Sequence, residues 1–120
     1  MTSYKNLVVW QRSIELTCTT YLLTGSFSEG ERYGLVSQMR RAAISVASNI
    51  AEGYSRRLRR EYARFVQIAF GSGAELETQI VLAKKLGFAS EQECAIIDKQ
   101  LDEVMRMLNR LIAALRGSDH

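Results

Sequence analysis

The chain has 120 residues, of which 47% are hydrophobic and 24% are charged, and its net charge is +3. This length suits one domain that can bury a core without disulfides or metals, and we expect that domain to span residues 1–116, with a disordered tail at 117–120. No apolar run is long enough to cross a membrane. Cys18 and Cys94 form no C-x-x-C pair, so we expect two reduced thiols in a cytoplasmic protein.

Proline is absent, which favours long uninterrupted helices. The first predicted helix covers about residues 7–24 and is followed by Gly25. One of its faces is apolar and contains Leu7, Trp10, Ile14, Cys18 and Tyr21. A second apolar line on the same helix consists of Val9, Leu16 and Leu23. Because a helix in an isolated bundle needs one apolar stripe, we predict that this second line contacts another subunit.

Three further segments show helical periodicity. Ser28 and Glu31 predict a capping box for a helix that runs to about residue 52 and is closed by Gly53. The next helix is predicted over residues 58–86, before Gly87, and the last over residues 91–116, after a second predicted capping box at Ser90 and Glu93. Short connections place successive helices antiparallel, so the predicted fold is all-α, an up-down-up-down four-helix bundle.

A polar stripe runs along each of the two middle helices. The members that we assign to a polar network or an interface are Gln38, Arg41, Asn49, Glu52, Glu75 and Gln79, accompanied by Ser45, Ser48, Glu61, Arg64 and Ser72. Facing stripes could exchange hydrogen bonds and arginine–carboxylate pairs. Two interpretations remain open: a groove for a ligand or nucleic acid, and a structural network that fixes helix register or a subunit contact.

A catalytic arrangement is hard to build from this sequence. Its single histidine, His120, is the last residue, so no Ser-His-Asp or Cys-His arrangement can form within one chain. The cysteine spacing does not fit zinc, and no Glu-x-x-His element is present for a bundle metal site. We therefore expect no enzyme activity, no metal, no cofactor and no small-molecule substrate.

Five arginines occur within nine positions between the second and third predicted helices: Arg56, Arg57, Arg59, Arg60 and Arg64. Cations at a helix N-terminus oppose the helix dipole, which invites an anionic partner. One interpretation is phosphate contact with RNA or DNA, with Tyr54 and Tyr62 as nearby aromatics that could stack on bases. The other is a solvated basic loop, or arginines that pair with acidic residues of a neighbouring subunit.

Several short motifs together resemble the 23S rRNA-intervening sequence protein family. They are residues 7–11 (LVVWQ), 33–35 (YGL), 38–42 (QMRRA), 48–53 (SNIAEG), 68–72 (IAFGS) and 75–79 (ELETQ). The likeness covers nearly the whole chain, which is also similar to the accessory protein of diversity-generating retroelements. The family often has proline where this chain has Ser28, and again just before the SNIAEG run, where it has Ala47 and Ser48.

The resemblance implies a four-helix bundle assembled as a homopentamer, with a nucleic-acid role. Combined with the arginine cluster, it leads to our first hypothesis, an oligomer that binds RNA or DNA. The second hypothesis is a scaffold or protein-interaction module with no nucleic-acid role, in which the arginines serve subunit contacts.

Overall fold

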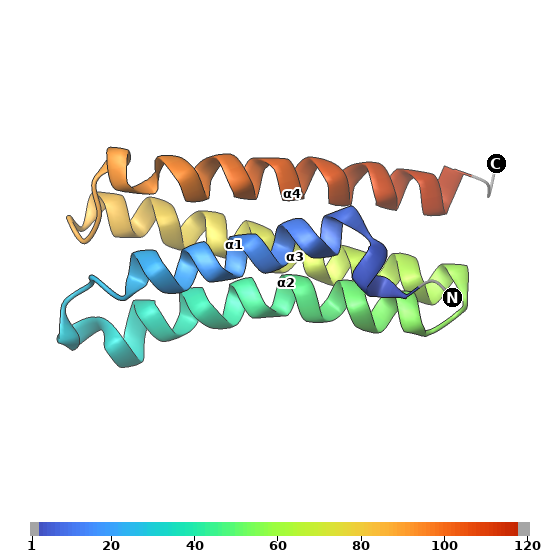
Figure 1. Ribbon diagram of the computed structural model, residues 1–120, viewed down its shortest axis with the longest axis horizontal. Coiled ribbons are helices and arrows are strands. Elements are labelled where there is room, and N and C mark those ends of the chain that lie inside the picture. The colour runs from blue at the N-terminus through green and yellow to red at the C-terminus, as the bar shows by residue number, and fades with distance from the viewer. Residues whose placement is uncertain (1–2, 118–120) are drawn as a thin grey trace.

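Four antiparallel helices make up the computed structural model, which describes residues 3–117. They are α1 (Val8–Thr24), α2 (Ser37–Ser55), α3 (Arg59–Lys85) and α4 (Glu91–Gly117). Each helix runs opposite to the one before it, α1 packs against α2 and α4, and α3 packs against the same two helices (Figure 1). The bundle measures 47 × 26 × 20 Å, and the described part of the chain contains no strand. The predicted up-down-up-down bundle is confirmed.

The core follows the apolar periodicity of the helices. On α4, Ile97, Leu101, Val104 and Leu108 recur every three or four residues, and all four are buried. The fully buried side chains include Met39 and Ile50 from α2 and Leu76 and Ile80 from α3, so each helix contributes one stripe to a shared interior. Burial of a side chain of this size stabilises the fold by roughly 1.5–3 kcal/mol.

The second apolar line of α1 faces the core, contrary to our prediction, and of the first line only Leu7 and Trp10 also pack against the core. Leu16 is fully buried, Val9 is nearly so, and Leu23 packs against the same core. The predicted subunit contact of these three residues is therefore wrong, since Val9 and Leu16 have no free surface for a partner. Exposed instead are Ile14, Cys18 and Tyr21 from the other face of the helix. The apolar line of Val9, Leu16 and Leu23 can be recognised in the sequence, but its neighbour is the core of the same chain and not another subunit.

The two predicted capping boxes have different outcomes. At α4 the Ser90 N–H donates to Glu93 Oε1 (2.8 Å) and the Glu93 N–H donates to Ser90 Oγ (3.0 Å), so this box is confirmed. At Ser28 the Glu31 N–H donates to the backbone carbonyl instead (3.0 Å), so that box is wrong. A 3-10 turn η2 (Glu29–Glu31) and a π-helical turn η3 (Arg32–Val36), kinked at Gly34, precede α2. Two glycines in this short segment weaken its helical preference.

The glycines predicted at the helix ends also have different outcomes. Gly87 has φ of 81° and follows α3 as predicted. Gly53 does not end α2, which continues to Ser55; instead it lies buried where α2 meets Tyr62 and Phe65 of α3. Gly117 is still helical, and the rest of the predicted tail, with His120, lies outside the described residues.

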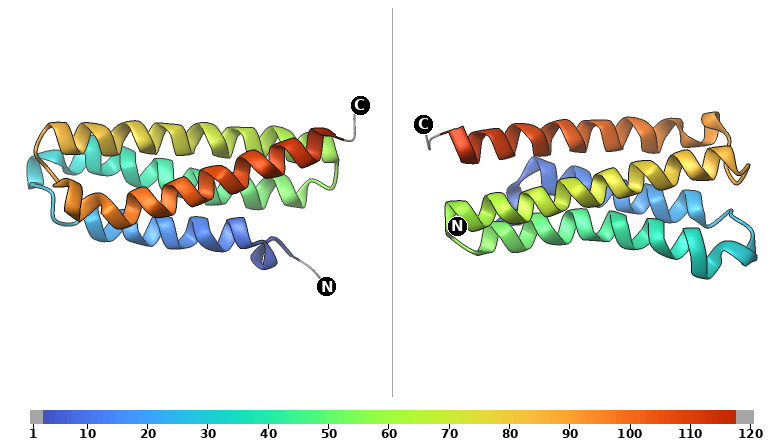
Figure 2. Two further views of the ribbon diagram at one scale, coloured as in Figure 1. Left: turned by 90° about the horizontal axis from the view of Figure 1, so that it is seen from above. Right: turned by 180° about the vertical axis from the view of Figure 1, so that it is seen from behind.

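One end of the bundle gathers three separate parts of the chain. Seen from above and from behind, the first described residues, the α2–α3 turn and the last turn of α4 lie at the same end (Figure 2). The 3-10 turn η1 (Tyr4–Asn6) leads into α1 there. No helix among residues 3–117 is long and apolar enough to cross a membrane.

Candidate nucleic-acid interface

This end of the bundle carries a marked excess of positive charge, and we call it the basic end (residues 3–7, 52–64 and 110–117). Eight of the 16 lysines and arginines of the chain lie here, with only the glutamates Glu52 and Glu61 among these residues. The eight are Lys5, Arg56, Arg57, Arg59, Arg60, Arg64, Arg110 and Arg116. The five arginines of the predicted cluster are all exposed. The net charge of +3 is thus distributed very unevenly along the molecule.

The α2–α3 turn is short, and its backbone is tightly constrained. Arg57 has φ of 71°, the left-handed conformation that lets the chain reverse between two long helices. Arg56 pairs with Glu52 (2.9 Å) on the last turns of α2. Its guanidinium also lies over the ring of Phe65, 5.0 Å from the centroid, and that of Arg64 lies 4.9 Å from the same centroid. These two arginines are therefore held in place within the chain.

Arg59 has hydrogen-bond partners within the chain, and they reduce the cost of placing a cation at the start of α3. It donates to the carbonyls of Leu115 (Nε, 3.0 Å) and Ala114 (Nη2, 2.8 Å) in the last turn of α4. Those carbonyls have no partner within their own helix, and they form the negative end of its dipole. Because α3 and α4 are antiparallel, the unfavourable position of Arg59 at the start of α3 is offset by the end of α4.

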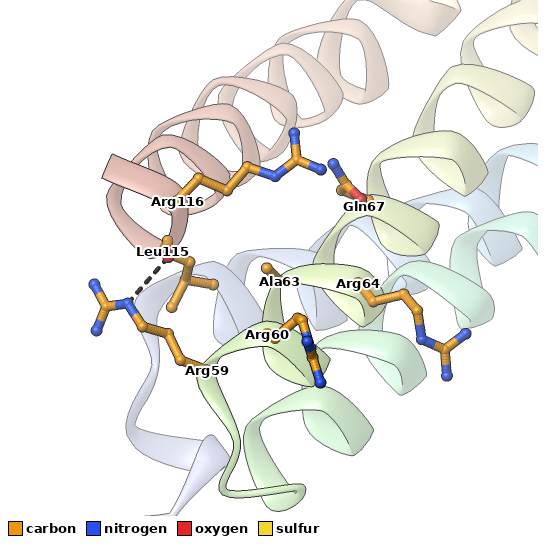
Figure 3. Close-up of a pocket in the computed structure, with 7 residues that line it drawn as sticks. All are labelled: Arg59, Arg60, Ala63, Arg64, Gln67, Leu115 and Arg116. Atoms are coloured by element: carbon orange, nitrogen blue, oxygen red, sulfur yellow. Dashed lines mark hydrogen bonds between the residues drawn. The ribbon is translucent and has the colours of Figure 1, made fainter. Parts of the chain in front are cut away.

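A hollow of about 590 Å³ opens between the start of α3 and the end of α4. We call it the arginine hollow; its lining residues are Arg59, Arg60, Ala63, Arg64, Gln67, Leu115 and Arg116. Figure 3 shows Arg60 and Arg64 projecting from α3 while Arg116 reaches across from α4 towards Gln67. The structure thus brings Arg59, Arg60 and Arg64 of the predicted cluster together and adds Arg116. The antiparallel topology could have indicated Arg116, since it places the end of α4 beside the start of α3.

A second hollow of about 490 Å³ lies on the N-terminal side of the same turn. We call it the tyrosine hollow; its lining residues are Ser3, Tyr4, Tyr54, Ser55 and Arg57. The Tyr4 ring makes an edge contact with Trp10 (centroids 5.3 Å apart), and the Tyr54 ring makes one with Tyr62 (5.8 Å). Burial, with a smaller contribution from Tyr54, raises the pKa of the Tyr62 phenol, so this group stays neutral near pH 7. Tyr62 packs against the core, whereas Tyr4 and Tyr54 border the hollow.

The polar stripes of α2 and α3 meet in part. The hydroxyls of Ser45 and Ser72 are 2.8 Å apart, and Asn49 Nδ2 donates to Ser45 Oγ (3.0 Å). Gln79 is 4% exposed, and its Oε1 has no hydrogen-bond partner among the described residues. Serines and an asparagine therefore carry the observed bonds between the stripes and within α2.

The predicted arginine–carboxylate pairing between the two stripes is wrong. Gln38, Arg41 and Glu75 border one shallow hollow, but no ion pair among residues 3–117 joins Arg41 to Glu75. Glu52 pairs instead with Arg56, the residue that directly follows α2. Both Arg41 and Glu75 are exposed, and solvation of the two charges offsets most of what a pair would gain.

An apolar surface lies along the groove between α1 and α2 on the outside of the bundle. Its hollow is bordered by Tyr4, Trp10, Ile14, Thr17, Ile44, Ala47, Ser48 and Ala51. Ile14 and Ile44 are 38% and 43% exposed, so both present apolar side chains to solvent at this hollow. Residues 3–117 contain no group of three or more histidine, cysteine, aspartate or glutamate side chains that could hold a metal ion.

Comparison of the sequence with known protein families identifies one match. The family model for the 23S rRNA-intervening sequence protein matches residues 5–110. The chain belongs to this family. The match includes all of α1, α2 and α3 and most of α4, so the predicted family resemblance is confirmed over residues 5–110. No curated protein matches the chain.

Proposed function

We propose that this member of the 23S rRNA-intervening sequence protein family is a non-enzymatic, cytoplasmic homo-oligomer that binds RNA or DNA through the basic end. The observation that carries the proposal is the arginine hollow, where three arginines of α3 and one of α4 border a single opening. The number of subunits, five, is taken from the family resemblance. Two free thiols, Cys18 and Cys94, support a reducing compartment.

The electrostatic basis of the proposal is that several of these cations have no acidic partner among the described residues. Arg60, Arg64 and Arg116 have no ion pair with an acidic side chain in the part of the chain that the structure describes. Arginines of this kind bind phosphate oxygens and release the counterions of the nucleic acid. Each neutralised phosphate of a duplex then lowers the slope of log K against log salt by roughly 0.9.

Filter binding of labelled RNA and DNA at low and moderate salt tests this function. Replacement of Arg60, Arg64 and Arg116 by glutamine should abolish most of the binding and flatten its salt dependence. The control variant replaces Arg41, Lys85 and Lys99 by glutamine; these residues are exposed, lie away from the basic end and carry the same total charge. Absence of binding by the wild-type protein at low salt, or equal loss in both variants, would refute the proposal.

Assembly is the second part of the proposal, and the apolar surface between α1 and α2 supports it. Light scattering coupled to size exclusion should find wild-type oligomers, and a double variant with Ile14→Glu and Ile44→Glu should be smaller. Ile96→Glu is the matched control, because Ile96 is an exposed isoleucine on α4. A monomeric wild type at micromolar concentration would contradict the assembly.

The scaffold alternative is favoured by the same apolar surface and predicts oligomers without nucleic-acid affinity. The two experiments together distinguish the hypotheses, since filter binding decides the role of the arginines and light scattering decides the role of the apolar surface.

A further inference from the structure

We infer that the nucleic acid bound at the basic end is single-stranded and that one of its bases docks in the tyrosine hollow. This inference rests on the proposed function and makes it more specific. Its basis is the juxtaposition of two hollows of different chemistry on either side of one turn.

The tyrosine hollow combines the groups that single-stranded nucleic acids use for binding. Tyr4 and Tyr54 provide aromatic surface, Arg57 provides a cation, and Ser3 and Ser55 provide hydroxyls at the edge. Stacking of a base on an aromatic side chain tolerates any base, and arginine adds a cation–π contribution. At about 490 Å³ the hollow falls within the range of pockets that take small ligands, roughly 300–1,000 Å³.

The neighbouring arginine hollow supplies what the tyrosine hollow lacks. Its lining includes four arginines but no aromatic side chain, which suits a phosphate backbone but provides nothing for a base to stack on. Only Leu58 separates Arg57 of one hollow from Arg59 of the other in sequence. A strand that crosses the α2–α3 turn would thus meet phosphate-binding groups on one side and a stacking site on the other.

A single strand is expected because its bases, unlike those of a duplex, can reach the tyrosine hollow. In a duplex each base is stacked and paired, so it reaches an aromatic hollow only if it is flipped out at a cost of a few kcal/mol. A single strand presents its bases without this cost. The tyrosine hollow therefore adds affinity for a single strand and none for a duplex, which is held by phosphate contacts alone.

The experiment measures fluorescence anisotropy with three probes: an oligothymidylate of about 15 nucleotides, the same backbone with abasic sites, and the corresponding duplex. The variants are Tyr54→Ala and Tyr4→Ala. The matched control is Tyr33→Ala, because Tyr33 is 90% exposed and belongs to η3, at the opposite end of the bundle (Figure 1). Circular dichroism establishes that each variant retains its helices.

We expect the wild type to bind oligothymidylate more tightly than either other probe at moderate salt, where phosphate contacts are weakened. Tyr54→Ala and Tyr4→Ala should each lower oligothymidylate affinity by roughly five-fold or more and leave the abasic strand and the duplex unchanged. Tyr33→Ala should behave as the wild type. If a tyrosine variant unfolds, the wild-type ratio of oligothymidylate to abasic affinity decides the question alone.

Equal, salt-dependent binding of all three probes, untouched by the tyrosine variants, would overturn the inference and leave the proposed function standing. Failure of every probe to bind at low salt would instead overturn the proposed function and the inference with it.

Discussion

Three glycines of the middle helices differ in what surrounds them. A Cβ atom on Gly53 would lie 2.6 Å from the Cβ of Phe65, a rigid neighbour in the core. On Gly73 it would meet the sulfur of Met105, the flexible end of a long side chain. On Gly71 nothing lies within 4 Å. Residues of one type thus serve close helix packing at two sites and no packing at the third.

Alanine substitution should separate these roles. We expect Gly53→Ala to destabilise the fold by about 1–3 kcal/mol through overpacking. For Gly73→Ala the change should stay within about 1 kcal/mol, because methionine can shift. Gly71→Ala should stabilise α3 by roughly 0.5–1 kcal/mol through helix propensity. Urea denaturation of the three variants measures the order, and a Gly53→Ala variant as stable as Gly71→Ala would contradict it.

At the scale of the elements, the Ser-x-x-Glu capping pattern predicts the start of α4 correctly but does not predict the start of α2. Ser90 and Glu93 form the predicted reciprocal box because a regular helix follows at once. Ser28 and Glu31 have the same spacing, but α2 begins only at Ser37. A capping motif therefore predicts a helix start only where the next residues can continue the helix.

This pair provides a matched test of capping. Ser90→Ala should lower the free energy of unfolding by about 1 kcal/mol, since one N-terminal amide of α4 loses its acceptor. Ser28→Ala should change it by less than about 0.5 kcal/mol, as expected for an exposed residue without a cap. Thermal or urea unfolding decides between the two values, and equal losses would show that Ser28 has a role absent from the structure.

The contact between the ends of α3 and α4 has its own consequence. Arg59→Ala removes two donors from the last carbonyls of α4, so we expect faster amide hydrogen exchange over residues 112–117 and a loss of about 0.5–1 kcal/mol there. Arg60→Ala is the control, because it removes the same charge one residue later in α3 without these bonds. Unchanged exchange in Arg59→Ala would mean that the bonds do not hold the helix end.

For the whole molecule, the helix count, order and antiparallel direction could all be predicted from periodicity and short connections. The family motifs could be predicted as well. The neighbours of each face could not, because α1 has two apolar lines and its sequence does not say which one points inward. The arginine cluster could be predicted from the sequence, and the antiparallel topology could also have indicated that Arg116 lies beside it.

The inward choice on α1 can be measured in the whole fold. Leu16→Ala should lower the free energy of unfolding by about 2–5 kcal/mol, since it leaves a cavity in the shared core. Ile14→Ala, two positions earlier and 38% exposed, should cost well under half of that in a single subunit. Denaturation at protein concentrations too low for assembly measures both values. A larger loss for Ile14→Ala than for Leu16→Ala would contradict the burial of Leu16.

The antiparallel arrangement also governs the electric field around the molecule. Helices α3 and α4 have 27 residues each, and α1 and α2 have 17 and 19, so their macrodipoles nearly cancel in pairs. Side chains alone then set the polarity of the bundle. Because the Debye length at physiological salt is about 8 Å and the bundle is 47 Å long, the two ends are electrically independent. An approaching partner therefore interacts with the local charge of one end, and the net charge of the chain has little effect on it.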